Sequence, residues 1–242
     1  MVNVSRFRKL LFIFPLLLCS VSLMGCSSGF QTIMPSPPDL SLFIKAGCVQ
    51  KEYVLDCSAI GLEKKYSCAK IGYPSSYAGS LTPKVSMAEC RVNGDYRDST
   101  VKGVYAVGCR MRTYIRYIVS TSDGFKLLAN KEEFSRFFIP IETPEEALGF
   151  LESITGNEFW DKTYLKKNMD VKKGPYVEIF APDVKPSFVE QTKEGFEVRL
   201  FKRDLCGCEH PVFAIDYLVT RDAKVIELAR LKIIEFKGPC VD

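Results

Sequence analysis

The sequence predicts an α+β protein, in which an antiparallel β-meander packs against two helices and follows a disulfide-rich, loop-dominated lobe. Three observations support this class. Apolar and polar residues alternate in several segments between residues 176 and 234. Capping patterns at Asn130 and Thr143 precede two short helical segments. Eight cysteines follow residue 26, and five of them lie between residues 42 and 112.

Residues 42–112 form the predicted lobe. Turn-forming residues are frequent there, as in GYPSSYAGSLTP, and regular periodicity is weak. Because five cysteines cannot all pair within the lobe, at least one bridge must leave it if all are oxidised. We therefore expect a disulfide to join the lobe to the α+β domain, residues 113–242, so that the two form one unit.

The α+β domain begins with a predicted hairpin, in which residues 113–120 and 125–130 flank the turn TSDG. The two predicted helices that follow cover residues 131–138 and 144–155. Each starts with a capping side chain followed three residues later by Glu133 or Glu146, which is the capping-box pattern. Gly156 is a natural stop for the second helix.

The final third of the chain supplies the predicted meander. Its candidate strands are YVEIFA, SFVEQT, FEVRLFKR, VFAIDYLV and VIELARLKII. In the fourth, Phe213, Ile215 and Tyr217 alternate with polar positions, as expected for a strand with one buried face. In the fifth, the alternation slips near Ala229, which predicts a bulge or a strand covered on both sides.

The first 41 residues differ in composition from the rest. Three basic residues and no acidic one precede about 14 apolar residues, a run shorter than the roughly 20 that a membrane-spanning helix needs. A charged start, a short apolar run and a small residue before Cys26 describe a secretory signal peptide, residues 1–25. Residues 26–41 are rich in serine and proline, which predicts a partly extended tether.

The stretch Leu23-Met24-Gly25-Cys26 resembles the lipobox of bacterial lipoproteins. The resemblance covers residues 1–26 only and implies that Cys26 becomes the first mature residue, with a diacylglyceryl group on its sulfur and a further acyl chain such as palmitate. Two or three acyl chains give stable anchoring. Ser27 resembles the default for outer-membrane sorting in a cell with two membranes. The alternatives are a secreted protein with an incidental Cys26 and a membrane-spanning anchor.

The charge balance is close to even once the leader is set aside. The chain has 33 Lys and Arg against 29 Asp and Glu, and three of the basic residues lie in the leader. The rest of the chain has 30 basic side chains and 29 acidic ones. Nucleic-acid binding needs clustered basic residues, so we expect no nucleic-acid partner.

An even number of cysteines in an exported chain predicts four disulfides. The candidates are Cys48, Cys57, Cys68, Cys90, Cys109, Cys206, Cys208 and Cys240. Hairpin pairing of the last two predicted strands places Cys240 opposite Leu205. We therefore predict that either Cys206 or Cys208 bonds Cys240, and that the other reaches back to the lobe, with Cys109 as a candidate partner.

The segment Cys206-Gly207-Cys208-Glu209-His210 brings two sulfurs, a carboxylate and the single histidine together. Thiolate and imidazole suit copper or zinc, and closely spaced cysteines can form a redox pair. Oxidised thiols and the hairpin geometry favour structural disulfides instead. We predict no cofactor and no metal, with Cys206, Cys208 and His210 as the alternative metal or thiol site. Standard hydrolase, zinc-protease, phosphate-loop and dinucleotide signatures are absent.

The sequence thus favours a non-enzymatic, lipid-anchored, extracytoplasmic protein of the cell envelope that binds an envelope protein or glycan or serves structurally. The alternative is an envelope enzyme, either a hydrolase or a metal or thiol protein that uses residues 206–210. Seven tyrosines between Tyr66 and Tyr117 could line a glycan or protein surface or supply apolar area to the lobe. We expect Trp160 to cover a core edge.

Overall fold

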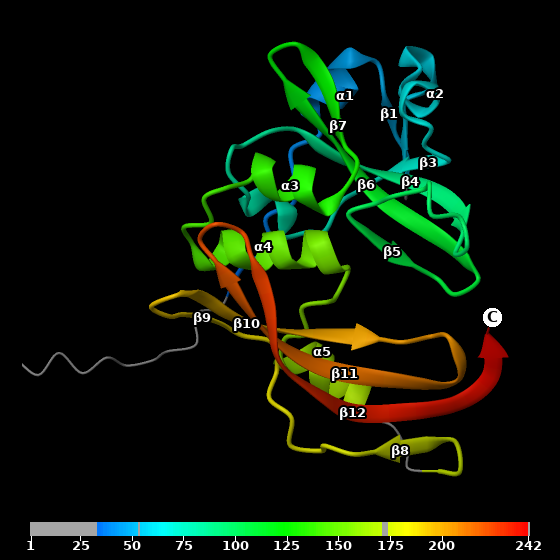
Figure 1. The fold of residues 1–242 in the computed structure, drawn as a ribbon, viewed down its shortest axis with the longest axis vertical. Helices are drawn as coiled ribbons and strands as arrows, with labels where there is room; N and C mark the ends of the chain where they lie inside the picture. The colour runs from blue at the N-terminus through cyan, green and yellow to red at the C-terminus, as the bar shows by residue number, and fades with distance from the viewer. Residues whose placement is uncertain (1–32, 53, 171–173, 242) are drawn as a thin grey trace, which may run out of the picture.

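The computed structural model describes residues 33–52, 54–170 and 174–241. Its helices are α1 (Ser41–Ala46), α2 (Leu62–Tyr66), α3 (Lys131–Phe137), α4 (Pro144–Thr155) and α5 (Lys162–Met169), with 3₁₀ turns η1 (Ser58–Ile60) and η2 (Ala78–Ser80). Its strands are β1 (Val49–Gln50), β2 (Leu55–Asp56), β3 (Lys70–Gly72), β4 (Met87–Asp95), β5 (Tyr105–Val107), β6 (Met111–Thr121), β7 (Gly124–Leu128), β8 (Val177–Ile179), β9 (Val189–Gln191), β10 (Gly195–Arg203), β11 (Gly207–Thr220) and β12 (Val225–Val241). The predicted α+β class is confirmed (Figure 1).

The first sheet has the order β3-β4-β6-β5, with β7 paired to β6, and all its pairs are antiparallel. The hairpin predicted around TSDG is the β6–β7 pair. The boundary predicted after residue 112 falls inside β6, which pairs along its length with β4. Residues 42–112 and the residues after them therefore share one sheet, and the first segment contributes more strand than its weak periodicity indicated.

The second sheet has the order β8-β12-β11-β10-β9. Strands β9 to β12 form the predicted meander, but β8 pairs with β12 at the opposite edge from β9. The chain after β8 holds this position, because the Phe180 backbone N–H donates to the carbonyl of Ile233 at 2.9 Å. A register shift between Asp216 and Tyr217 leaves Leu228 without a facing residue. The bulge predicted near Ala229 is thus confirmed.

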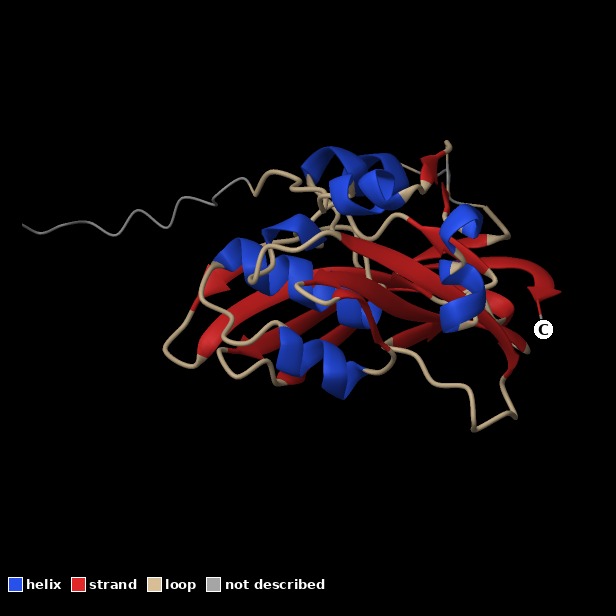
Figure 2. Ribbon diagram, turned by 90° about the horizontal axis from the view of Figure 1, so that it is seen from above, coloured by secondary structure: helices blue, strands red, loops and turns tan. Residues whose placement is uncertain are grey.

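Helix α4 lies between the two sheets (Figure 1), which overlap when seen from above (Figure 2). Both predicted caps are present: the Asn130 side chain accepts from the Glu133 N–H at 2.9 Å, and Thr143 and Glu146 form a full capping box. The helix ends at Gly156 with φ of 67°, as predicted. Its apolar residues Ala147, Leu148, Leu151 and Ile154 are buried.

The polar side of α4 is buried as well, which the sequence pattern did not indicate. Phe150 and Ser153 are fully enclosed, and Glu152 is 8 % exposed. The reason is that residues 75–80, which include η2, pack on this side of the helix, where the Ser75 hydroxyl donates to Glu152 Oε2 and the Ser80 hydroxyl donates to the Glu145 carbonyl. Gly149 permits the closest approach, because a Cβ there would lie 2.4 Å from the carbonyl oxygen of Tyr77.

Residues 33–40 pack against the body of the protein. Ile33 is 6 % exposed and belongs to the main core. The Gly79 N–H donates to the Ser36 carbonyl at 2.8 Å, and the Met87 N–H donates to the Asp39 carbonyl at 3.2 Å. These contacts fasten the segment to the first sheet and to η2.

This docking differs from the extended tether that the sequence predicts over residues 26–41, because apolar and backbone groups of its second half find partners in the fold. The leader and Cys26 lie outside the described residues. Within the described ranges, no helix is both long and apolar enough to cross a bilayer.

All eight candidate cysteines are paired. The bonds are Cys48–Cys57, Cys68–Cys90, Cys109–Cys206 and Cys208–Cys240. The last bond is one of the two that hairpin geometry allowed for Cys240, and the third joins the remaining cysteine to its candidate partner Cys109. Irregularities along β11 and β12 bring Gly207 opposite Val241, so Cys240 meets Cys208 and leaves Cys206 to reach Cys109.

Helix α5 is an element that the sequence analysis missed. The Asp161 side chain caps it by accepting from the Tyr164 N–H at 2.6 Å. Trp160, just before the helix, is 1 % exposed and stacks on Phe201 with ring centroids 4.5 Å apart. Trp160 therefore belongs to a small core on the outer face of the second sheet, together with Leu165 of α5.

Candidate binding site

The inner face of the first sheet carries a hollow of about 580 Å³ beside the C-terminal end of α4. Its polar lining consists of Lys70, Glu89, Arg91, Asn93, Tyr105 and Thr113. Strand register explains why these residues share a face. In β4, every second residue points inward, and Asn93 faces Thr113 while Arg91 faces both Lys70 and Ile115.

A carboxylate and a guanidinium form the centre of the hollow. Glu89 is 5 % exposed, and the Arg91 Nε donates to its Oε1 at 2.5 Å. Burial raises the pKa of the Glu89 carboxyl, and the Arg91 charge opposes that rise. In the described part of the chain, Glu89 Oε2 accepts no hydrogen bond and the Arg91 Nη groups donate none. The pair therefore presents one acceptor oxygen and a forked donor to an incoming ligand.

Tyr105 forms the side of the hollow nearest α4. Its ring packs on Gly156, where a Cβ would lie 2.4 Å from the ring, so any larger residue would displace the tyrosine. Burial raises the pKa of Tyr105, so its hydroxyl remains protonated at neutral pH. Behind it, the Tyr117 hydroxyl donates to the Ser153 carbonyl of α4 at 2.9 Å. The helix thus fixes the tyrosine wall of the hollow.

A disulfide supports the same wall from the other side. Cys109 follows β5 by two residues, and its bond to Cys206 ties the β5–β6 turn to the connection between β10 and β11. Figure 1 shows this turn and that connection at the same end of the molecule. Because the bond holds the Cα atoms of Cys109 and Cys206 5.4 Å apart, it limits how far the end of β5 can move from the second sheet. The hollow is therefore largely pre-formed.

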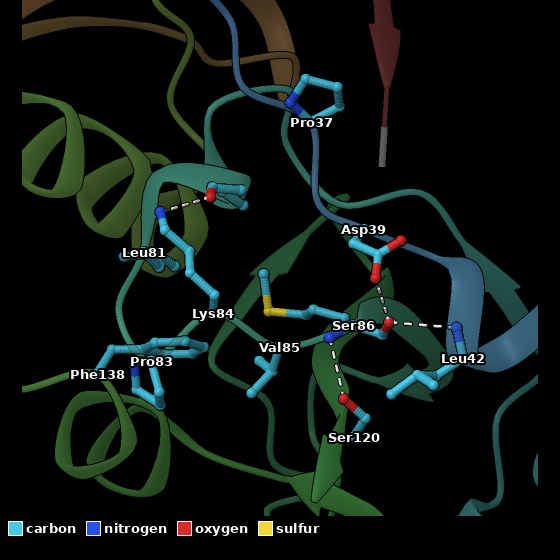
Figure 3. A pocket seen from close by; sticks show the side chains of 13 residues that line it. Pro37, Asp39, Leu42, Leu81, Pro83, Lys84, Val85, Ser86, Ser120 and Phe138 are labelled. Atoms are coloured by element: carbon cyan, nitrogen blue, oxygen red, sulfur yellow. Dashed lines mark hydrogen bonds between the residues drawn. The ribbon is translucent and has the colours of Figure 1, made fainter.

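A second hollow, of about 280 Å³, lies where residues 37–42 cross the first sheet (Figure 3). The Ser86 hydroxyl donates to Asp39 Oδ2 at 3.0 Å and accepts from the Leu42 N–H at 3.3 Å. A serine beside a carboxylate would need a base such as histidine or lysine to become a nucleophile, and Lys84 of this hollow instead donates to the carbonyls of Gly79 and Ser80. The single histidine, His210, instead has its Nε2 3.2 Å from the Pro239 carbonyl oxygen. Ser86 here fastens the N-terminal segment.

The sequence-predicted cluster at residues 206–210 does not assemble into a shared site. Cys206 and Cys208 form disulfides with different partners, so neither offers a thiolate while these bonds hold. His210 Nε2 must carry the proton in its contact with Pro239, because a carbonyl oxygen can only accept. Among the residues that the structure describes, no three His, Cys, Asp or Glu side chains are grouped as metal ligands.

The residues of the first hollow were missed because they lie in the segment read as a loop-rich lobe. A signal was present: Glu89, Arg91 and Asn93 are polar at every second position of MAECRVNGD. This pattern is typical of one strand face. The intervening residues Ala88, Cys90 and Val92 face the other way and pack into a separate small core.

No protein-family model matches the chain, and neither does any curated protein or any solved structure.

Proposed function

We propose that this chain is a lipid-anchored protein of the cell envelope whose hollow on the first sheet binds a hydroxyl-rich saccharide. The lipobox-like leader supports export and acylation at Cys26. Four disulfides suit an oxidising, extracytoplasmic compartment, where such bonds persist. The observation that carries the ligand assignment is the ion pair between the buried Glu89 and the half-exposed Arg91, with its unused acceptor and donors.

Saccharide hydroxyls match this pair chemically. A hydroxyl is both donor and acceptor, so one hydroxyl can donate to Glu89 Oε2 while its neighbour on the ring accepts from an Arg91 Nη group. Asn93 and Thr113 add polar groups of both kinds on the same face. The half-buried Tyr105 adds an aromatic surface against which the apolar C–H groups of a sugar can pack.

Size and charge agree with this class of ligand. The hollow of about 580 Å³ lies within the range of pockets that hold small ligands. The lining has two basic residues, Lys70 and Arg91, and one acidic residue, Glu89, so its net charge is positive. This favours a neutral or mildly acidic saccharide over a basic one. Because strands and a disulfide hold the lining, little ordering cost opposes binding.

The test titrates the purified, lipidated chain with soluble oligosaccharides released from the envelope of the producing cell. Arg91→Lys keeps the charge beside Glu89 but loses the forked donor, so we expect about tenfold weaker binding. The matched control is Arg112→Lys, because Arg112 is exposed on the opposite face of the same sheet. The proposal fails if no saccharide binds, or if Arg91→Lys and Arg112→Lys bind as the unmodified protein does.

A further inference from the structure

The outer edge of β12 is open over residues 225–232. Strand β11 pairs with one side of β12, whereas β8 covers the other side only at Ile234 to Phe236. No other described strand pairs with the outer side of residues 225–232. An edge of this length leaves a row of backbone donors and acceptors ready to pair with another strand.

The exposed edge is also apolar. Ile226, Leu228 and Leu231 are 49 %, 51 % and 48 % exposed. Soluble proteins usually protect a long edge with proline, charge or a covering segment. The charges on this edge are Lys232, which pairs with Glu235, and an ion pair in which Arg230 donates from Nε and Nη2 to the two Glu227 oxygens at 2.9 and 2.8 Å.

The bulge at Leu228 makes this edge complementary to itself. Because of the bulge, Glu227 faces Tyr217 and Arg230 faces Ile215, so both point to the inner face although they are three residues apart. Likewise, Ile226 faces Leu218 and Leu231 faces Ala214, so both lie on the outer face. A regular strand would place residues three apart on opposite faces.

A two-fold axis between Leu228 and Ala229 would therefore pair side chains of matching kind. Glu227 would face Arg230 of the second copy, and Ile226 would face Leu231 of the second copy, each pair occurring twice. This register extends from Val225 at the turn to Lys232, which lies just before the residues of β12 that β8 covers. It therefore uses the whole open edge. Opposite charges and apolar pairs across strands stabilise such a sheet.

We propose that residues 225–232 of β12 pair antiparallel with the same residues of a second copy, joining the second sheets of two molecules into one continuous sheet. The interface is isologous, as expected for a two-fold dimer. It lies on the second sheet and does not depend on what the hollow of the first sheet binds.

The test places a photo-crosslinking amino acid at Leu228 in the full chain, produced in its own envelope. Illumination should yield a covalent dimer. The matched control carries the same amino acid at Val49, which is 57 % exposed in β1 and should yield none. Glu227→Arg and Arg230→Glu should each weaken the dimer about tenfold, because each places like charges opposite each other twice. The double exchange should restore it.

Three outcomes would overturn the proposal: no dimer from Leu228, a product between Leu228 and a different protein, or a dimer unaffected by the single charge reversals. The thermal midpoint and the four disulfides of each variant are checked first. Since Glu227 and Arg230 are exposed and the double exchange keeps their ion pair within the chain, the doubly exchanged protein remains a valid test even if a single reversal lowers stability.

Discussion

Glu152 makes the stability of this protein depend on pH, and Glu152→Gln should remove its share of that dependence. The carboxylate lies inside the core on α4, 8 % exposed, where Oε1 accepts from the Phe159 N–H at 2.8 Å and Oε2 accepts from the Ser75 hydroxyl. Burial raises the pKa of Glu152 from the ordinary 4.5 to about 7, and the nearby Glu158 charge adds to the rise. The two hydrogen bonds oppose it.

The sign follows from which state binds the proton more tightly. Between pH 4.5 and about 7 the folded protein is protonated at Glu152 while the unfolded chain is not, so the free energy of unfolding falls as the pH rises. At about 1.4 kcal/mol per pH unit, the loss amounts to about 3 kcal/mol by pH 8. Glu89, whose pKa is also raised by burial, contributes a further loss of the same sign.

Urea unfolding at pH 5 and pH 8 measures this. The amide of Glu152→Gln can accept from Phe159 and donate to Ser75 without a charge, so the variant should match the unmodified protein near pH 5 and exceed it by up to about 3 kcal/mol at pH 8. Glu132→Gln, at an exposed position of α3, is the control and should change neither value. The reasoning is refuted if Glu152→Gln loses stability equally at both pH values.

Three further predictions concern the disulfides, the cap of α4 and the leader. Replacing both Cys109 and Cys206 by serine should lower the free energy of unfolding by about 5 kcal/mol, whereas removing the Cys48–Cys57 bond should lower it by about 3 kcal/mol. The difference arises because the longer loop gains more entropy on unfolding once its bond is removed. Equal losses in urea titrations would contradict this. Thr143→Ala should cost about 1 kcal/mol of the same quantity through loss of the α4 capping box, and an unchanged midpoint would contradict it. Mass spectrometry of the protein from its membrane should find an acylated Cys26 at the N-terminus, whereas an unprocessed Met1 would refute the leader assignment.

The parts of the fold that the sequence predicted correctly are those set by local rules. The cap at Thr143, the stop at Gly156 and the bulge near Ala229 each depend on a few neighbouring residues. The Cys208–Cys240 bond was one of two predicted alternatives, because pairing in a hairpin determines which residues lie opposite each other. The proposed lipid at Cys26 remains a prediction.

The features that the sequence did not reveal depend on what packs from a distance. Burial of Glu152 depends on residues 75–80, which pack on the polar side of α4, and no pattern within the helix indicates that contact. The Glu89–Arg91 pair was missed although residues 88–93 alternate between apolar and polar, because this pattern does not show that β3, β5 and β6 complete a hollow around the polar face. Placement of β8 beside β12 likewise depends on a chain crossing rather than on local sequence.

Burial of Ile33 in the core has a consequence for where this protein can act. Six residues separate Cys26 from Ile33, and the seven residue-to-residue steps of a fully stretched chain reach at most about 25 Å. If Cys26 is acylated, the folded body can move only within that radius of the lipid headgroups. Its encounters would then be confined to molecules at the surface of its own bilayer, and a component held at an opposing membrane would have to approach that surface to be bound.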